Sequence, residues 1–545
     1  MSANKKKGSK RNSLKTAPQQ IADMIMVFLT MSYVVVMLCI YPLYFHDKYF
    51  DMGDSKYEFF RWFSLVVLGL AIVGLVYFVI CYFKEIKWKE LHKEISVCDA
   101  FVIAFGFLSL LSYLASDYKD TALWGYSGWF MGLMSQFMFV AAYYFVSRFW
   151  EWSSGVLKAA LIVAALCYQM GILQRFGFNP LGMYDGVGDQ DIMKFLSTLG
   201  QTSWYSSYAI LMMPLGMYMY WKADAIDLKS RILYGFFTAL GYGMICTTNS
   251  DSAYMAIVFI LLVFFRYSLD SNERMKRFLE MVLIGLCSFR IIGWLHATLD
   301  EREYKLFVGT EDMTIFMTES KFMYIPLIAV IVIYILFIQL TKKKSDKEAF
   351  DISLYRKPIW AVTVGAVIAV AATAVFLVFA VTAGKIEKLQ DVNILNFTNA
   401  WGNHRGFNWR MAWEAFGNAS VKDFLIGVGP DCFADAMNTY CLEDVYNYWS
   451  GQALACAHNE WFNMLVTQGI LGVVAYIGIF ITALIRGAKT VSKNPVVIPF
   501  MALIVAYMSH NFFCYQQCIC TPVVFIAIAM IELQAHWKGE PQSRL

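Results

Sequence analysis

Three polar residues, His458, Asn459 and Glu460, stand directly before a long apolar run that begins at Trp461 and reads as a membrane helix. An imidazole with its ordinary pKa of about 6.5 can accept a proton near neutral pH. An adjacent amide and carboxylate can orient the ring or a bound substrate. The sequence therefore predicts His458 as a general base, with Asn459 and Glu460 as substrate-binding residues. The alternative for His458 is an interfacial histidine that caps the helix.

A second group of candidates lies earlier, in the segment HRGFNWRMAWEAFGNASVKDFLIGVGPDCF, residues 404–433. Its first part predicts a helix that rests on the membrane with an aromatic face, because one cation and several apolar residues recur at helical spacing. These residues are Arg405, Trp409, Ala412, Trp413 and Phe416. The helix should end at Gly417 and Asn418. Gly427 and Gly429 then predict a tight turn, and Asp431 is expected to cap a short second helix.

Arg405 lies near the start of this helix, where the helix dipole disfavours a cation. A guanidinium fork fits phosphate oxygens well, so Arg405 predicts a bound anion such as a lipid phosphate. The alternative is an arginine that only snorkels to the membrane surface. Arg410 leaves the Arg405 face by one residue and is a candidate helper.

The composition indicates that the chain is a membrane protein. The chain has 545 residues, of which 59% are hydrophobic and 16% charged, whereas soluble proteins carry roughly a quarter charged residues. Apolar stretches of about 20 residues recur throughout, as in membrane-spanning helices. We expect an all-α polytopic fold with fourteen spans. They are residues 22–45, 62–83, 99–116, 128–147, 156–173, 204–221, 231–248, 252–267, 278–296, 322–341, 358–384, 460–485, 496–510 and 519–536.

Basic residues predict the orientation of the chain. The N-terminus reads KKKGSKRNSLK, and every second loop after it is also basic, as in TKKKSDKEAFDISLYRK. We therefore place both termini in the cytoplasm and the polar segment 385–457 outside. The expected organisation is a basic tail, eleven spans, an extracytoplasmic catalytic loop, three spans and a second tail. Their boundaries are 1–21, 22–384, 385–457, 458–536 and 537–545.

Other classes of function fit the sequence less well. The net charge of +4 follows from the topology and gives no reason to expect nucleic acid. A transporter should carry ionisable residues within several spans, but the predicted spans are almost free of charge, Arg290 being the chief exception. We expect no cofactor and no metal, because the acidic residues of the outer segment are expected on a solvated face. These are Asp431, Asp435, Glu443 and Asp444. A disulfide among the outer cysteines stays open.

Several motifs, taken in order, resemble the O-antigen ligase and polymerase superfamily of bacterial enzymes. The principal ones are Arg-Gly-x-x-x-Trp from Arg405, Gly-Val-Gly-Pro-Asp-x-Phe from Gly427, and Ala-His-Asn ending at Asn459. Weaker matches are LWGYSGWFMGL (123–133), STLGQTSWYSSYAILMMPLG (197–216) and NFFCYQQCICTPVVF (511–525). The resemblance implies a glycan transferase of the cytoplasmic membrane. Its donor would be a polyprenyl-pyrophosphate-linked glycan, and its acceptor a glycan or lipid-linked glycan.

The resemblance also implies roles for individual residues. His458 would be the base, and Arg405 would bind the pyrophosphate. Trp409, Gly427 and Gly429 would contact the substrate. Many members carry a second arginine at the start of a middle span, where this chain has Asp251 in TTNSDSAYMA. Arg410 and Arg175 are candidate replacements. Polymerase and ligase both fit, and a flippase or exporter of lipid-linked glycans is the alternative function.

Overall fold

The computed structural model describes residues 15–86, 94–223, 227–248, 250–299, 312–342 and 349–536. The tail 537–545 and most of the tail 1–21 lie outside these residues. The fold is all-α, as predicted, apart from one short antiparallel hairpin of β1 (Phe195–Leu196) and β2 (Gly200–Gln201).

Each of the fourteen predicted spans coincides with a helix. Nine of these helices in the described parts of the chain are long and apolar enough to cross a membrane. They are α1 (Ala17–Val35, continued by tighter and wider turns to Leu43), α2 (Met52–Tyr82), α3 (Val97–Ala115), α6 (Ser154–Arg175), α10 (Asp251–Ser268), α11 (Asn272–Thr298), α13 (Tyr324–Thr341), α14 (Arg356–Thr382) and α19 (Glu460–Thr490). The other predicted spans are shorter or less apolar. They are α5 (Leu133–Phe149), α8 (Thr202–Lys222), α9 (Leu228–Thr248), α20 (Val497–His510) and α21 (Thr521–His536).

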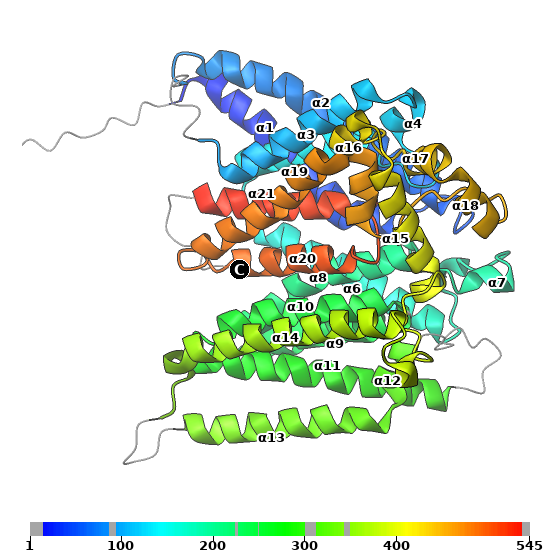
Figure 1. Ribbon diagram of the computed structural model, residues 1–545. Helices are drawn as coiled ribbons and strands as arrows, with labels where there is room; N and C mark the ends of the chain where they lie inside the picture. The colour runs from blue at the N-terminus through cyan, green and yellow to red at the C-terminus, as the bar shows by residue number, and fades with distance from the viewer. Residues whose placement is uncertain are drawn as a thin grey trace, which may run out of the picture.

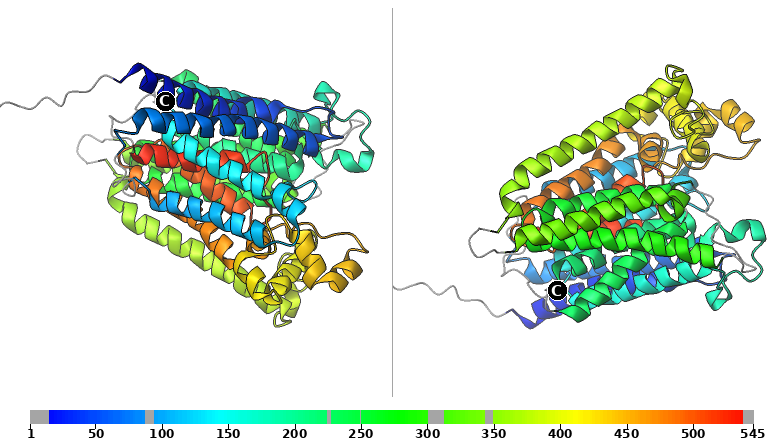
Figure 2. Two further views of the ribbon diagram at one scale, coloured as in Figure 1. Left: turned by 90° about the horizontal axis from the view of Figure 1, so that it is seen from above. Right: turned by 90° about the horizontal axis from the view of Figure 1, so that it is seen from below.

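The long helices run side by side along one common direction, and the short helices of the segment 385–457 gather at one end of this bundle (Figure 1). The C-terminal end of α21 lies at the opposite end (Figure 1). Views from above and from below show the same separation, with α14 slanting along the outside (Figure 2). The short helices of this segment are α15 (Trp401–Gly417), α16 (Val421–Ile426), α17 (Phe433–Tyr440) and α18 (Leu442–Tyr448). Three further short helices lie elsewhere in the chain: α4 (Lys119–Trp124), α7 (Asp189–Ile192) and α12 (Asp312–Glu319).

A break in α19 joins the short helices to the bundle. Gly469 adopts a left-handed backbone (φ +66°) and interrupts the helix. The carbonyls of Val466 and Thr467 are then free to accept hydrogen bonds from the backbone N–H groups of Val428 (3.2 Å) and Gly429 (3.0 Å). A side chain at Gly469 would collide with the backbone at Ile426. The segment 385–457 is thus fixed to the first two turns of α19.

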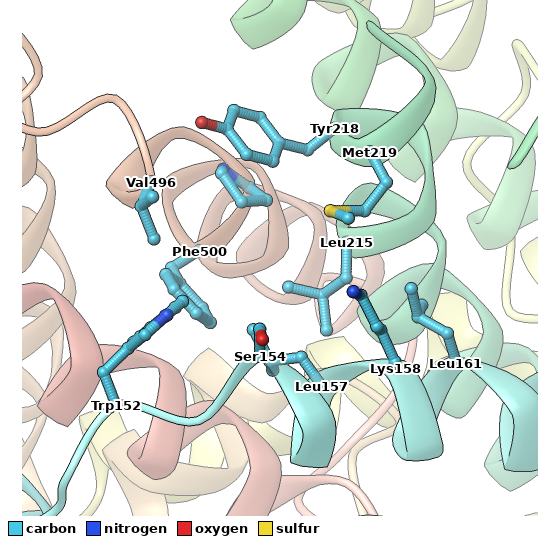
Figure 3. A pocket seen from close by; sticks show the side chains of 11 residues that line it. Trp152, Ser154, Leu157, Lys158, Leu161, Leu215, Tyr218, Met219, Val496 and Phe500 are labelled. Atoms are coloured by element: carbon cyan, nitrogen blue, oxygen red, sulfur yellow. The ribbon is translucent and has the colours of Figure 1, made fainter. Parts of the chain in front are cut away.

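An apolar pocket lies at the N-terminal end of α20. The start of α6 and the end of α8 form the rest of its wall (Figure 3). Its volume is about 20 Å³, and its walls include Leu157, Leu215 and Phe500. The candidate chemistry lies beyond His510, at the far end of α20. This pocket therefore takes no part in it.

Candidate active site

The start of α19 presents His458 in a constrained position. Asn459 caps the helix, because its side-chain oxygen accepts the N–H groups of Trp461 (3.0 Å) and Phe462 (3.1 Å). His458 itself has a left-handed backbone (φ +51°), which is uncommon outside glycine and costs free energy. The cap is therefore Asn459 and not His458. The Nδ2 atom of Asn459 is buried and has no partner among the described residues.

The His458 ring is half-buried between two aromatic side chains. Its centroid lies 5.8 Å from that of Trp129 and 5.5 Å from that of Tyr515, both edge-on. No described side chain hydrogen-bonds to its ring nitrogens, and its backbone N–H contacts the Cys456 sulfur at 3.3 Å. Burial, and to a smaller extent the positive charge of Arg405, together lower the pKa of His458 to about 4. At neutral pH the imidazole is uncharged and able to accept a proton.

Arg405 lies at the start of the right-handed part of α15. Three residues with a left-handed backbone conformation, from Gly402 to His404, precede it and change the direction of the chain. The guanidinium donates from Nη1 to the Gly402 carbonyl (2.7 Å) and from Nη2 to the Phe513 carbonyl (3.1 Å). Its side chain is half-buried, so the two carbonyls fix its plane without enclosing it.

The turn after α20, residues 511–516, joins the two candidate residues. The Phe513 carbonyl holds Arg405, and the Tyr515 ring contacts His458. Asn511 accepts the Glu460 backbone N–H with its own carbonyl (2.9 Å) and donates from its side chain to the Glu460 carboxylate. This turn therefore sets the positions of the base and the cation together.

Glu460 is fully buried, and its carboxylate is occupied within the protein. It accepts hydrogen bonds from the hydroxyls of Tyr476 and Tyr507 as well as from Asn511. Glu460 therefore positions the turn at Asn511 against the first residues of α19. The substrate contact predicted for it stays a prediction.

Trp409 lies one turn after Arg405, on the same face of α15. Its ring contacts those of Trp401 (5.3 Å), Phe462 (5.8 Å), Phe512 (5.5 Å) and Phe513 (5.8 Å). These rings form an apolar wall beside the guanidinium. Trp413, one turn further, is 62% exposed, as expected of a side chain that rests on a membrane.

Gly427 and Gly429 allow the outer segment to approach α19 closely. Gly427 has φ +77°, and a Cβ there would lie 2.2 Å from the Thr467 carbonyl group. Gly429 has φ +148°, and its Cβ would lie 2.5 Å from the Ser116 hydroxyl. Both glycines thus have a packing role, and their predicted contact with substrate stays a prediction.

The prediction that Asp431 caps a helix on a solvated face is wrong. Asp431 is buried, and its Oδ2 accepts the backbone N–H groups of Tyr126 (2.9 Å) and Met131 (2.8 Å). It therefore fixes the loop that carries Trp129. Burial raises the pKa of Asp431 to about 7. Glu443 and Asp444 are exposed, as expected.

The two candidate replacements for the missing arginine contact other groups than Arg405 and His458. Arg410 is exposed, with its guanidinium 5.9 Å from the Phe407 ring centroid. Arg175 is buried and donates to the carbonyls of Thr247 (2.8 Å) and Met193 (3.0 Å). Arg175 therefore reaches the segment in which Asp251 stands, but its guanidinium is engaged by the backbone.

Sequence reasoning missed Trp129, Tyr515 and Asn511 as parts of this site. A signal for them was present, since all three lie in segments with weaker motif matches. A third such segment also reaches the site, because the Tyr515 hydroxyl donates to Gln201 Oε1 (2.8 Å). All twelve cysteines are free, so the structure contains no disulfide among them.

The fold and the site define a multi-pass helical membrane protein with a polar site at one end of its bundle. The family model for O-antigen ligase matches residues 306–477, just under a third of the chain. The chain is thus similar to this family over the segment that contains Arg405 and His458, and the resemblance inferred from the motifs is confirmed there. No curated protein matches the chain. The family implies an enzyme that transfers glycans and uses lipid-linked glycan substrates.

Proposed function

We propose that the protein is a metal-independent membrane glycosyltransferase, a polysaccharide polymerase or ligase. It moves a glycan from a polyprenyl-pyrophosphate donor to a sugar hydroxyl at the outer face of the bacterial cytoplasmic membrane. One observation carries this proposal: a single turn, residues 511–516, contacts both a half-buried arginine and a histidine with unbonded ring nitrogens. A base and a cation in this arrangement suit a reaction in which the acceptor loses a proton and an anion leaves the donor.

The reaction would proceed in one displacement. The acceptor hydroxyl gives its proton to His458 as its oxygen bonds to the anomeric carbon of the donor sugar. The bond from this carbon to the pyrophosphate oxygen breaks, and its electron pair leaves with the polyprenyl pyrophosphate. The anomeric centre is inverted. A positioned base contributes roughly 10²–10⁴-fold in rate, and Arg405 stabilises the charge that grows on the leaving group.

The donor would also activate the base. The positive charge of Arg405 is one of the two causes that lower the pKa of His458. A pyrophosphate bound at Arg405 brings negative charge that offsets this cause, so the pKa of His458 rises toward its ordinary value. A base with a higher pKa takes up the acceptor proton more readily. The base would thus be strongest when the donor is in place.

The other predicted residues would assist around this centre. Trp409 and its aromatic neighbours would line the path of the polyprenyl chain. The unpartnered amide of Asn459 would hold a substrate oxygen close to the base. Arg410 could approach the pyrophosphate only if its exposed side chain turned toward it. Arg175 would have to leave its backbone partners to do so.

The proposed topology has fourteen spans, both termini in the cytoplasm and the segment 385–457 outside. It is supported by the alternation of basic loops and by the gathering of α15–α18 at one end of the bundle (Figure 1). Donor, acceptor and membrane lipid would meet at this end.

Loss of the protein tests the function in cells. Single repeats that accumulate on the lipid carrier would identify a polymerase, and full-length chains on the carrier would identify a ligase. An exporter would instead leave its substrates at the cytoplasmic face, out of reach of a glycosidase added to intact spheroplasts. That last result would overturn the proposal.

A further inference from the structure

We infer a second binding site beside His458: a polar cavity that holds one hydroxyl of the acceptor sugar while the sugar ring lies against Trp129. This inference rests on the glycan transfer proposed above, which requires an acceptor sugar next to the base. It adds the residues that select this sugar.

The cavity adjoins the base. Its volume is about 20 Å³, and Trp129 and Tyr515 form part of its wall. The same two rings flank the His458 ring at 5.8 and 5.5 Å. A cavity of this size has room for one water or one hydroxyl, but not for a sugar ring. The ring of a bound sugar must therefore stay outside, where part of the Trp129 side chain is exposed.

Two polar side chains in the wall have an unused hydrogen-bonding atom. Asp431 accepts two backbone N–H groups with Oδ2, and its Oδ1 has no partner among the described residues. Asn463 accepts the Ala457 N–H with Oδ1 (3.4 Å), and its Nδ2 is likewise without a partner there. When the Asp431 carboxylate is ionised, above its pKa of about 7, the wall thus offers one acceptor and one donor. A hydroxyl can donate to the first and accept from the second.

The aromatic part of the wall suits the rest of a sugar. The carbon-bound hydrogens of a sugar form an apolar face that packs on a flat ring, and small-molecule sites commonly combine aromatic walls with a few placed polar groups. Asp431 fixes the Trp129 loop through Tyr126 and Met131, and Tyr515 is fixed through Gln201. Both rings are therefore held in place before any ligand arrives.

The arrangement also separates donor from acceptor. Arg405 lies on the Phe513 carbonyl, whereas the cavity lies on the Tyr515 and Gln516 side of the same turn. A sugar on Trp129 would approach His458 from one side and the pyrophosphate donor from the other. One hydroxyl in the cavity fixes which neighbouring hydroxyl reaches the base.

A polarity swap tests the inference. Asp431→Asn keeps an oxygen for the Trp129 loop but turns a donor toward the cavity. Asn463→Asp keeps an oxygen for Ala457 but turns an acceptor toward it. Each single variant mismatches the hydroxyl and should weaken binding by at least about tenfold. The double variant again offers one donor and one acceptor, so binding should return, a rescue that a merely structural role would not give.

Binding is read by saturation-transfer difference NMR on the purified protein. The probes are the free monosaccharides released by acid hydrolysis of the producing cells' own envelope polysaccharides and glycolipids, so the acceptor sugar of a polymerase or of a ligase is among them. We expect signals from at least one sugar, lost in each single variant and in Trp129→Leu, and restored in the double variant. Trp124→Leu, a partly exposed tryptophan of the same region, should keep them.

Absence of any sugar signal, or equal signals in all variants, would overturn the inference and leave a cavity that holds water only. These results need no turnover, so they do not bear on the transferase proposal. The transferase proposal fails separately if the wild-type protein does not transfer glycan, and the role of His458 in it fails if the His458→Ala variant still transfers at the wild-type rate.

Discussion

Replacing Arg405 by lysine separates a pyrophosphate-binding role from snorkelling. Two backbone carbonyls, of Gly402 at 2.7 Å and Phe513 at 3.1 Å, hold the guanidinium plane. Lysine keeps the charge but has a single nitrogen, so it cannot bind both carbonyls and also present a fork to phosphate. A hydrogen bond to a charged group contributes about 1.5–3 kcal/mol. Loss of one such bond in the transition state lowers kcat/KM by about 10- to 150-fold.

The assay measures initial rates of purified protein in detergent with a defined polyprenyl-pyrophosphate glycan, together with donor affinity. Arg410→Lys is the comparison variant, since this arginine is exposed on the same helix, and its rate should fall less than that of Arg405→Lys. The thermal midpoint of each variant shows that the loss is not one of folding. Wild-type turnover and donor affinity in Arg405→Lys would refute the reasoning, because a snorkelling arginine tolerates lysine.

Three further predictions concern the outer segment. Gly427→Ala should lower the thermal midpoint and abolish transfer, because the left-handed backbone and the contact with α19 leave no room for a Cβ; Gly417→Ala, which meets open space, should do neither, and equal midpoints would contradict this. A membrane-impermeant thiol reagent on intact cells should label a cysteine at Asn438 and not one at Leu354, and the reverse pattern would invert the topology. Burial raises the Asp431 pKa to about 7, so the folded state holds this proton more tightly than the unfolded state. Stability should then fall by up to about 4 kcal/mol as pH rises from about 4 to 7. Unfolding curves at several pH values should show a smaller fall in Asp431→Asn, and an unchanged fall would show that Asp431 is not the group that titrates.

The helices could be predicted because each needs only local information. A long apolar run has one stable form in a bilayer, and helices occupy all fourteen predicted spans. The break at Gly469 was not predicted, because a glycine within an apolar run reads as ordinary helix. Its conformation depends on the approach of Ile426 from the outer segment.

In the candidate site too, only the features that depend on local sequence could be predicted. His458 and Arg405 were predicted from residue type and from their places at helix ends. Asp431 was assigned wrongly because its partners, Tyr126 and Met131, lie about 300 positions earlier in the chain. No spacing rule connects residues so far apart. For the same reason the sequence could not show that Arg405 lowers the pKa of His458, since this effect acts through space.

The most direct test of the central claim is single-turnover transfer by the His458→Ala variant. Purified protein is saturated with polyprenyl-pyrophosphate glycan, acceptor is added, and transfer and donor binding are measured on the same sample. The ring is half-buried at a helix end, so its removal should leave the protein folded. We expect unchanged donor affinity and a transfer rate lower by roughly 10²–10⁴-fold. Transfer at a rate near that of the wild type would remove His458 from the chemical step and contradict the account.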